Sequence, residues 1–376
     1  MTTIGLCMIV KNESRVILRC LESVRPIVDY VLIEDTGSTD GTQTIIREYL
    51  NSEGLPGEVF DEPWQDFAYN RSIALARLRE KDDVDYALIM DADDVLMFEK
   101  GFDSIEFKEG LTHGFYNVSL RSGPTEYYRP LICSNRLPFS YRGVLHEFLA
   151  EARDGCSFGM AMGLHVFERK EGVRSQVPDQ YRKDAQLLEQ ALRTEEDPFL
   201  RSRYTFYLAQ SYYEAGESEK ALAVYLDRAK LGYSNQEVFV SLHVAGQIRE
   251  HLGHDDCEII GTYLKAYEAC PTRVESLHSA ARYCRVTGKN HLGYLIGKHG
   301  ITIRQPGSGL FIEPWAYQYG LLDEFSICAY WTKRYAECLE TCERILAQES
   351  LPEDVRVRVK RNAGFALEKL SSAAVP

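Results

Sequence analysis

This sequence of 376 residues lacks the features that mark several large protein classes. It has no uninterrupted apolar run near the roughly 20 residues that cross a membrane. Neither G-x-G-x-x-G nor G-x-x-x-x-G-K-[ST] is present, which disfavours dinucleotide-dependent oxidoreductases and P-loop nucleotide hydrolases. The formal net charge of −13 disfavours a protein that coats nucleic acid, because phosphate contacts require clustered Lys and Arg.

Secretory and metal-binding cysteine signals are missing as well. The opening residues, MTTIGLCMIVKNES, contain neither a basic region nor a small-residue cleavage site, so we expect no secretory signal and a cytoplasmic protein without a transmembrane segment. The ten cysteines show no zinc-type spacing, and several lie on apolar faces of predicted helices. We expect them to be reduced thiols that pack as small hydrophobic side chains.

The first half alternates strand and helix patterns. Apolar or β-branched runs predict strands at residues 3–10, 30–35, 57–64 and 86–90, and periodic segments predict helices at 14–24, 42–50 and 67–80. Between the second strand and its helix lies TGSTDG, where Gly37 and Gly41 relieve backbone sterics and Ser38, Thr39 or Asp40 can cap the helix. This alternation predicts an α/β, Rossmann-like domain with a mainly parallel sheet.

The second half is helical and repetitive. Residues 201–233 fit a helix–turn–helix repeat of tetratricopeptide type, with looser copies at 238–271, 274–300 and 321–346. Each hairpin must bury its apolar stripe against the next, so the copies should stack into an all-α solenoid. We therefore predict two domains, residues 1–175 and 176–376, separated in the polar segment ERKEGVRSQVPDQ.

Acidic residues follow three of the predicted strands. They occur in Lys11-Asn12-Glu13, in Glu34-Asp35 and in Asp91-Ala92-Asp93-Asp94. In open α/β sheets, ligands bind beyond the carboxyl ends of the strands, so these segments are candidates for one site.

The Asp91-Ala92-Asp93 stretch has the composition of a metal-binding pair. If the extended backbone continues through Ala92, the two carboxylates point to the same side and suit Mg²⁺ or Mn²⁺ with diphosphate oxygens as further ligands. A second Asp-x-Asp, Asp83-Val84-Asp85, precedes its strand at the wrong end of the sheet, so we interpret it as solvated loop acids.

Four segments, in their order along the chain, resemble family 2 glycosyltransferases of GT-A fold: IGLCMIVKNE, YVLIEDTGSTDGT, NRSIALA and YALIMDADD. The stretch YRGVLHEFL resembles the G-x-x-H-E element of a bacterial branch of that family, with Tyr141 where Trp is common. That branch, which includes bacteriocin S-glycosyltransferases, often carries tetratricopeptide-like repeats after its catalytic domain. The resemblance covers residues 3–170 of the catalytic half.

The resemblance implies roles for individual residues. Those implied to bind the nucleotide sugar are Val10, Asn12, Glu13, Asp35, Arg71, Asp91 and Ala92. Asp35 would accept from the uracil N3–H, although it also suits the simpler role of opening the Thr36-Gly37 turn. Arg71 would meet base or phosphate, with an ordinary surface arginine as the alternative.

Metal-binding and catalytic roles follow from the same resemblance. Asp91, Asp93 and His165 would form the metal site, with Asp93 binding the metal directly and Asp91 binding the ribose or a metal-bound water. Helix capping is the alternative for the two aspartates, and a core histidine is the alternative for His165. Glu147 would be the general base of an inverting transfer, with His146 orienting it or completing the site; a surface His-Glu pair is the alternative.

The implied function is a metal-dependent, inverting hexosyltransferase that uses Mn²⁺ or Mg²⁺ and a UDP-sugar such as UDP-glucose. Its acceptor would be a peptide, a glycan or another macromolecule. A nucleotidyltransferase is disfavoured because only Lys11 and Arg15 are available near the N-terminus to clamp a triphosphate. The third hypothesis is an inactive GT-A domain fused to a tetratricopeptide adaptor. Aromatic residues of the helical half should form repeat core, with an acceptor surface or a homodimer interface as open alternatives.

Overall fold

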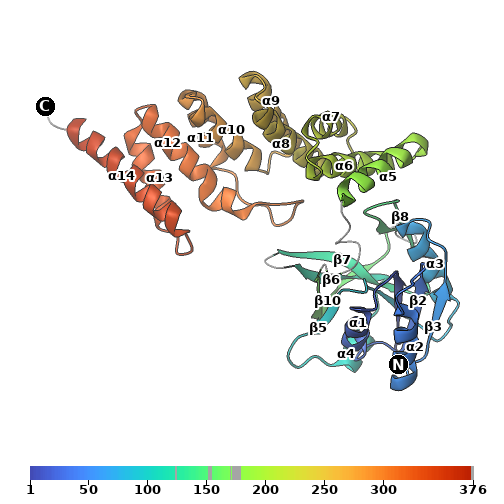
Figure 1. Ribbon diagram of the computed structural model, residues 1–376. Coiled ribbons are helices and arrows are strands. Elements are labelled where there is room, and N and C mark those ends of the chain that lie inside the picture. Colours follow the sequence, from blue (N-terminus) through green and yellow to red (C-terminus); the bar gives the residue numbers. More distant parts are fainter. Residues whose placement is uncertain (123–124, 151–154, 170, 172–178, 374–376) are drawn as a thin grey trace. The chain divides into compact units, whose positions relative to one another are not determined.

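The computed structural model describes residues 1–122, 125–150, 155–169, 171 and 179–373, and the chain divides into two compact units, Met1–Ala191 and Leu192–Pro376 (Figure 1). The domain boundary expected at residue 175 lies outside the described residues. The division between the units falls within α5, Gln180–Thr194.

The first unit is built on an eight-stranded sheet with the order β3-β2-β1-β4-β7-β6-β10-β5. Its strands are β1 (Ile4–Val10), β2 (Tyr30–Asp35), β3 (Gly57–Asp61), β4 (Tyr86–Ile89), β5 (Val95–Phe98), β6 (Phe115–Ser122), β7 (Thr125–Ser134) and β10 (Phe158–Phe167). Because β1 pairs in parallel with β2 and β4, and β2 with β3, the carboxyl ends of the four predicted strands share one edge. The predicted α/β class is confirmed.

The helices of this unit cover both faces of the parallel strands. They are α1 (Ile17–Val24), α2 (Thr42–Glu53), α3 (Phe67–Arg79) and the short α4 (Ser104–Glu109). Alternation along β1 divides the core, because Met8 packs with residues of α1 and α2 while Cys7 packs with Leu75 of α3. This helix-on-both-faces arrangement leaves the carboxyl edge of the strands for the acidic loops.

The other half of the sheet was not predicted. β7 pairs antiparallel with both β4 and β6, and β10 runs parallel to β6 and antiparallel to β5. A separate small sheet pairs β8 (Ser140–Arg142) with β9 (Phe148–Ala150). These additions carry the chain from the acidic turn after β4 to the predicted base, which lies just before β9.

The second unit is helical. Its elements are α6 (Pro198–Glu214), α7 (Ser218–Arg228), α8 (Asn235–Leu252), α9 (Asp256–Ala269), α10 (Glu275–Val286), α11 (Asn290–Gly300), η2 (Ala316–Gly320), α12 (Leu321–Trp331), α13 (Tyr335–Leu346) and α14 (Glu353–Ala373). From α6 onward, each α-helix packs against the next, as the ribbon shows (Figure 1). The predicted solenoid of helical hairpins is confirmed. In the part of the chain that the structure describes, no helix has the length and apolarity to cross a membrane.

Side chains of the repeats occupy the positions expected for a solenoid core. Tyr204, Phe206 and Tyr225 are at most 2% exposed, whereas Tyr213 and Tyr233 are exposed. All ten cysteines are free, and nine of them are buried. The expected packing as small hydrophobic side chains is therefore confirmed for these nine, whereas Cys257 is exposed.

Candidate active site

Hydrogen bonds join the loop after β1 to the loop after β2. The backbone N–H of Asn12 donates to Ser38 Oγ at 2.8 Å, and the N–H of Thr39 donates to Asn12 Oδ1 at 2.8 Å. The N–H of Glu13 donates to Thr42 Oγ1 at 2.8 Å. The left-handed backbone of Asn12, with φ of 58°, allows both of its contacts. The expected nucleotide-binding residues Asn12 and Glu13 thus lie in one fixed double loop.

Asp40 holds the second side of this double loop. Its carboxylate accepts from the N–H of Ser14 at 3.0 Å and from the N–H and hydroxyl of Thr42 at 3.1 and 2.6 Å. Burial raises the pKa of Asp40, but these hydrogen bonds outweigh burial and lower it to about 2. Gly37 and Gly41, with φ of 100° and 92°, provide the left-handed positions that the turn requires.

Asp35 combines the two roles that the sequence left open. Its side chain is buried, and Oδ1 accepts from the N–H groups of Gly37 at 2.9 Å and Ser38 at 2.7 Å, which forms the turn. Its Oδ2 has no hydrogen-bond partner among the described residues. The neighbouring Val10 carbonyl accepts from both the N–H and the hydroxyl of Thr36, at 2.9 and 3.0 Å. Val10 therefore supports the turn, while Oδ2 of Asp35 is available to accept a hydrogen bond.

The acids after β4 lie on a turn, and not on extended backbone. The N–H of Asp94 donates to the carbonyl of Asp91 at 3.2 Å, and Ala92 is buried in the core. The expectation that strand alternation aligns Asp91 with Asp93 is therefore corrected, because the chain bends at Ala92. Asp91 keeps a side chain that is 42% exposed.

Arg71 brings together three residues that the sequence named from distant segments. Its Nη2 forms an ion pair with Asp91 Oδ1, and its Nε donates to Glu147 Oε1 at 2.9 Å. The guanidinium lies 5.7 Å from the centre of the Tyr141 ring. Burial lowers the pKa of Arg71, but the two carboxylates outweigh burial, so the net direction is upward. The alternative of a surface arginine is excluded, since the Arg71 side chain is only 8% exposed.

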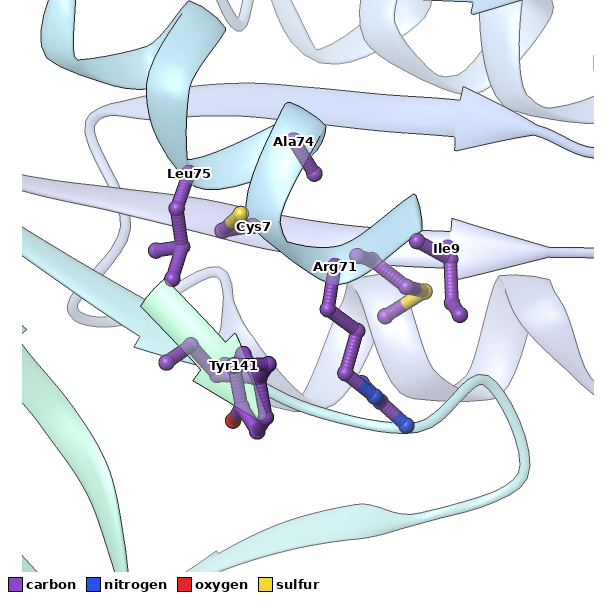
Figure 2. Close-up of a pocket in the computed structure, with 8 residues that line it drawn as sticks. Cys7, Ile9, Arg71, Ala74, Leu75 and Tyr141 are labelled. Atoms are coloured by element: carbon purple, nitrogen blue, oxygen red, sulfur yellow. The ribbon is translucent and has the colours of Figure 1, made fainter. Parts of the chain in front are cut away.

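A crevice of about 160 Å³ opens beside Arg71 (Figure 2). It is lined by Cys7, Met8, Ile9, Arg71, Ala74, Leu75, Ile89 and Tyr141. The close-up shows Arg71 of α3 and Tyr141 of β8 side by side, with side chains of β1 behind them. The space between these side chains is too narrow for a water molecule, so the crevice is an apolar seat for the guanidinium and not a donor pocket.

The His146-Glu147 pair follows a tight turn. Gly143 has a φ of 105°, and His146 has a φ of 50°, which is uncommon for a residue with a side chain. His146 is exposed, whereas the Glu147 side chain is only 10% exposed. The turn thus directs Glu147 toward Arg71, and these contacts contradict the alternative of a surface pair for Glu147.

His165 is not grouped with the two aspartates. It lies on β10 opposite Met97 of β5 and Ser119 of β6, next to the fully buried Val166. Burial lowers its pKa, followed by the effect of Arg121. Within the described ranges, no three His, Cys, Asp or Glu side chains are close enough to hold a metal ion. Asp91 and Asp93 carry carboxylate oxygens, the ligand type that Mg²⁺ and Mn²⁺ prefer.

Asp94 is a member of this site that the sequence analysis did not single out. It is 8% exposed, and burial followed by the charges of Asp91 and Asp93 raises its pKa to about 8. Glu168 adds a further negative charge and contacts the Tyr127 hydroxyl. No sequence signal points to this role, since the four residues after β4 do not show which carboxylate the turn buries.

Glu34 was also missed as a buried acid. It is fully buried, burial raises its pKa, and the opposing Arg77 pairs with it and with Glu62. Strand alternation contains the signal, because Glu34 and Asp35 are adjacent on β2 and must face opposite sides. Arg77 therefore ties α3 to the carboxyl ends of β2 and β3.

Known proteins resemble parts of this chain. Residues 6–127 match the model of glycosyl transferase family 2. This match lies within the first unit. The match ends within β7, so it includes the double loop, Arg71 and the acidic turn but not the segment with Glu147.

Two curated relatives match parts of the chain. A TPR repeat-containing protein of Synechococcus elongatus is 28% identical over 157 residues, which is 40% of this chain and 36% of the relative. The lipopolysaccharide core biosynthesis glycosyltransferase LpsC of Rhizobium meliloti is 34% identical over 64 residues, which is 17% of this chain and 23% of the relative. The chain thus matches well under half the length of each.

Solved structures resemble the chain at low similarity. S. aureus TarS 1–349 in complex with UDP-GlcNAc has 14% identity and a TM-score of 0.40, covering 71% of this chain and 91% of that one. A Podosopora anserina putative kinesin light chain with TPR-like repeats has 16% identity and a TM-score of 0.34, covering 48% and 90%.

Proposed function

We propose that this chain is a metal-dependent, inverting glycosyltransferase that transfers a hexose from a UDP-sugar to a macromolecular acceptor. The observation that carries the proposal is the Arg71 bridge between Asp91 and Glu147. It joins the acid turn of the family 2 domain to the candidate base from the G-x-x-H-E element. A displacement at one carbon requires the donor site and the base to lie close together, and the Arg71 bridge brings these two segments together.

The double loop supports recognition of the nucleoside. Asp35 Oδ2 is a buried acceptor without a described partner, and buried polar atoms normally have one. A uracil N3–H would satisfy it, while Oδ1 continues to hold the turn. Asn12 and Glu13, fixed by Ser38, Thr39 and Thr42, would border the base.

Asp91 and Asp93 would hold the metal. Mn²⁺ or Mg²⁺ bound there would neutralise charge on the diphosphate leaving group. His165 is left out of this proposal, because its neighbours on the sheet are Met97 and Ser119.

The transfer step is assigned to Glu147. An acceptor hydroxyl or thiol attacks the anomeric carbon, its proton passes to the Glu147 carboxylate, and the bond between that carbon and the diphosphate oxygen breaks. Arg71 fixes the carboxylate, because a side chain held by an arginine and 10% exposed has few alternative positions. The repeats would present the acceptor, since stacked hairpins offer a long surface.

Calorimetric titration of UDP, with and without Mn²⁺, tests the donor site. Wild type is expected to bind UDP in a metal-dependent way, and Asp93→Asn is expected to lose that dependence. Asp83→Asn is the matched control, because Asp83 is an exposed acid of the other Asp-x-Asp sequence. Wild type that binds UDP equally well without metal would contradict metal dependence. If neither UDP nor UDP-sugars bind, the glycosyltransferase proposal fails in favour of the adaptor.

A further inference from the structure

Two arginines near the acidic turn pair with other groups of the protein. Arg71 pairs with Asp91 and Glu147. Arg19 of α1 pairs with Glu171 at 2.8 Å and donates to the carbonyl of Asp93 at 3.1 Å. Both guanidinium groups are therefore occupied by protein acceptors.

Arg129 of β7 differs from these two arginines. No hydrogen bond or ion pair joins its side chain to another residue in the part of the chain that the structure describes, and the residue is half-buried. Its positive charge acts on Asp94, Tyr127 and Tyr141. A guanidinium with its donors available is suited to an anion from outside the chain.

The register of β7 places Arg129 on the side of the sheet that meets the acidic turn. Arg129 pairs with Val118 and Tyr127 pairs with Leu120, and both of these β6 partners are buried in the core. The Tyr127 hydroxyl contacts Glu168, whose charge also acts on Asp94. Tyr127 and Arg129 therefore point to the same side as the buried core, toward Asp94.

The Arg129 guanidinium interacts with residues from both parts of the site, the acidic turn and the segment around Tyr141. Ala92 of the acidic turn belongs to the same buried cluster as Val118 and Leu120, which lie opposite Arg129 and Tyr127. The charge of Arg129 acts on both Asp94 and Tyr141. Asp94 belongs to the acidic turn, and the Tyr141 ring lies beside Arg71. Arg129 thus lies within electrostatic reach of both the donor side and the candidate base.

A nucleoside diphosphate needs such a charge at this site. Asp91, Asp93 and Glu147 repel its phosphates, and the chain has no Gly-rich loop that would cradle them. Arginine binds phosphate oxygens with two parallel N–H donors, which adds direction as well as charge.

We propose that Arg129 binds the diphosphate of the donor, on the side of the acidic turn that faces Tyr141. This inference rests on the proposed function and assigns the phosphate contact to a residue beyond the family-model match, which ends at residue 127. The ligand class is a nucleoside diphosphate, recognised through its phosphate oxygens.

Titration of the full chain with UDP and with uridine, both in the presence of Mn²⁺, tests this assignment. Arg129→Met is expected to weaken UDP binding about 10- to 100-fold, because charged hydrogen bonds are lost, and to leave uridine affinity unchanged. Arg121→Met is the matched control, since Arg121 pairs with Glu126 on the opposite face of the same strand pair. It should bind UDP as wild type does.

Arg129→Lys provides a second test of the assignment if Arg129→Met does not fold. Lysine keeps the charge but not the paired donors, so a several-fold loss of UDP affinity is expected. Unchanged UDP affinity in a folded Arg129 variant, or an equal loss for uridine and UDP, would overturn the assignment and leave the proposed function standing. Wild type that binds no UDP would overturn both.

Discussion

Arg71 donates a 2.9 Å hydrogen bond from Nε to Oε1 of Glu147, a residue 76 positions further along the chain. Its Nη2 pairs with Asp91, so one buried cation links α3, the turn after β4 and the turn before β9. Two carboxylates that would otherwise repel each other thus share one arginine. The same ion pairs therefore stabilise the domain and position Glu147 for the proposed transfer.

Arg71→Met is expected to destabilise the first unit by about 3 kcal/mol, because removing one partner of a buried ion pair leaves the other charge uncompensated. Urea denaturation measures the change. Adding Glu147→Gln should recover part of the loss, since the stranded carboxylate is then neutral. Strictly additive losses in the double variant would show that the two residues are not coupled.

Glu147→Gln is expected to lower kcat by about 10²- to 10⁴-fold while leaving metal-dependent UDP affinity unchanged, because it removes the proton acceptor and not a donor contact. Sugar transfer or sugar-nucleotide hydrolysis gives kcat, and calorimetry gives the affinity. Glu126→Gln, which alters an exposed carboxylate of β7, is the control and should keep full activity. A Glu147→Gln protein with unaltered kcat would remove Glu147 as the base.

Gly246 of α8 permits a close approach of two solenoid helices. A Cβ at this position would lie 2.5 Å from the Tyr263 ring of α9, so Gly246→Ala should cost about 1–3 kcal/mol of unfolding free energy. Gly261→Ala is the matched control on α9, where a Cβ meets nothing within 4 Å. That control should gain about 0.5–1 kcal/mol from helix propensity. Equal effects in chemical denaturation would contradict this packing argument.

His243 should make the solenoid less stable in acid. Burial, as the largest cause, lowers its pKa from 6.5 to about 4 in the folded chain. Between these values the unfolded state binds a proton that the folded state does not, so stability is complete above about pH 6.5 and falls as the pH decreases toward 4. The expected loss from this residue is roughly 3 kcal/mol. Unfolding free energies measured across this window test it.

His243→Gln supplies the control for the pH dependence. Glutamine does not titrate and can keep a hydrogen bond to Ser279, which His243 Nε2 contacts at 3.0 Å. The variant should show a smaller decrease in stability between pH 6.5 and 4. Part of the decrease should remain, because burial also lowers the pKa of His278 to about 4. A variant with the full wild-type slope would exclude His243 as its source.

Elements with local signals could be predicted from the order of residues alone. Apolar runs ending in acids predicted β1, β2 and β4, and their shared parallel edge followed from the alternation of strands and helices. Helical periodicity at repeat spacing likewise predicted the solenoid, because each hairpin buries its stripe against the adjacent one. The residues around Asp35 and Asp91 could be named for this reason.

Which of the named residues meet depends on how distant segments pack together. Arg71 reaches Asp91 and Glu147 across long loop closures that no local pattern encodes. His165 was assigned to the metal by its order along the chain, yet the register of β10 places it opposite Met97 and Ser119. Local periodicity specifies which side of an element is buried, but contacts between distant segments depend on sheet order and register, which are set by packing of the whole domain.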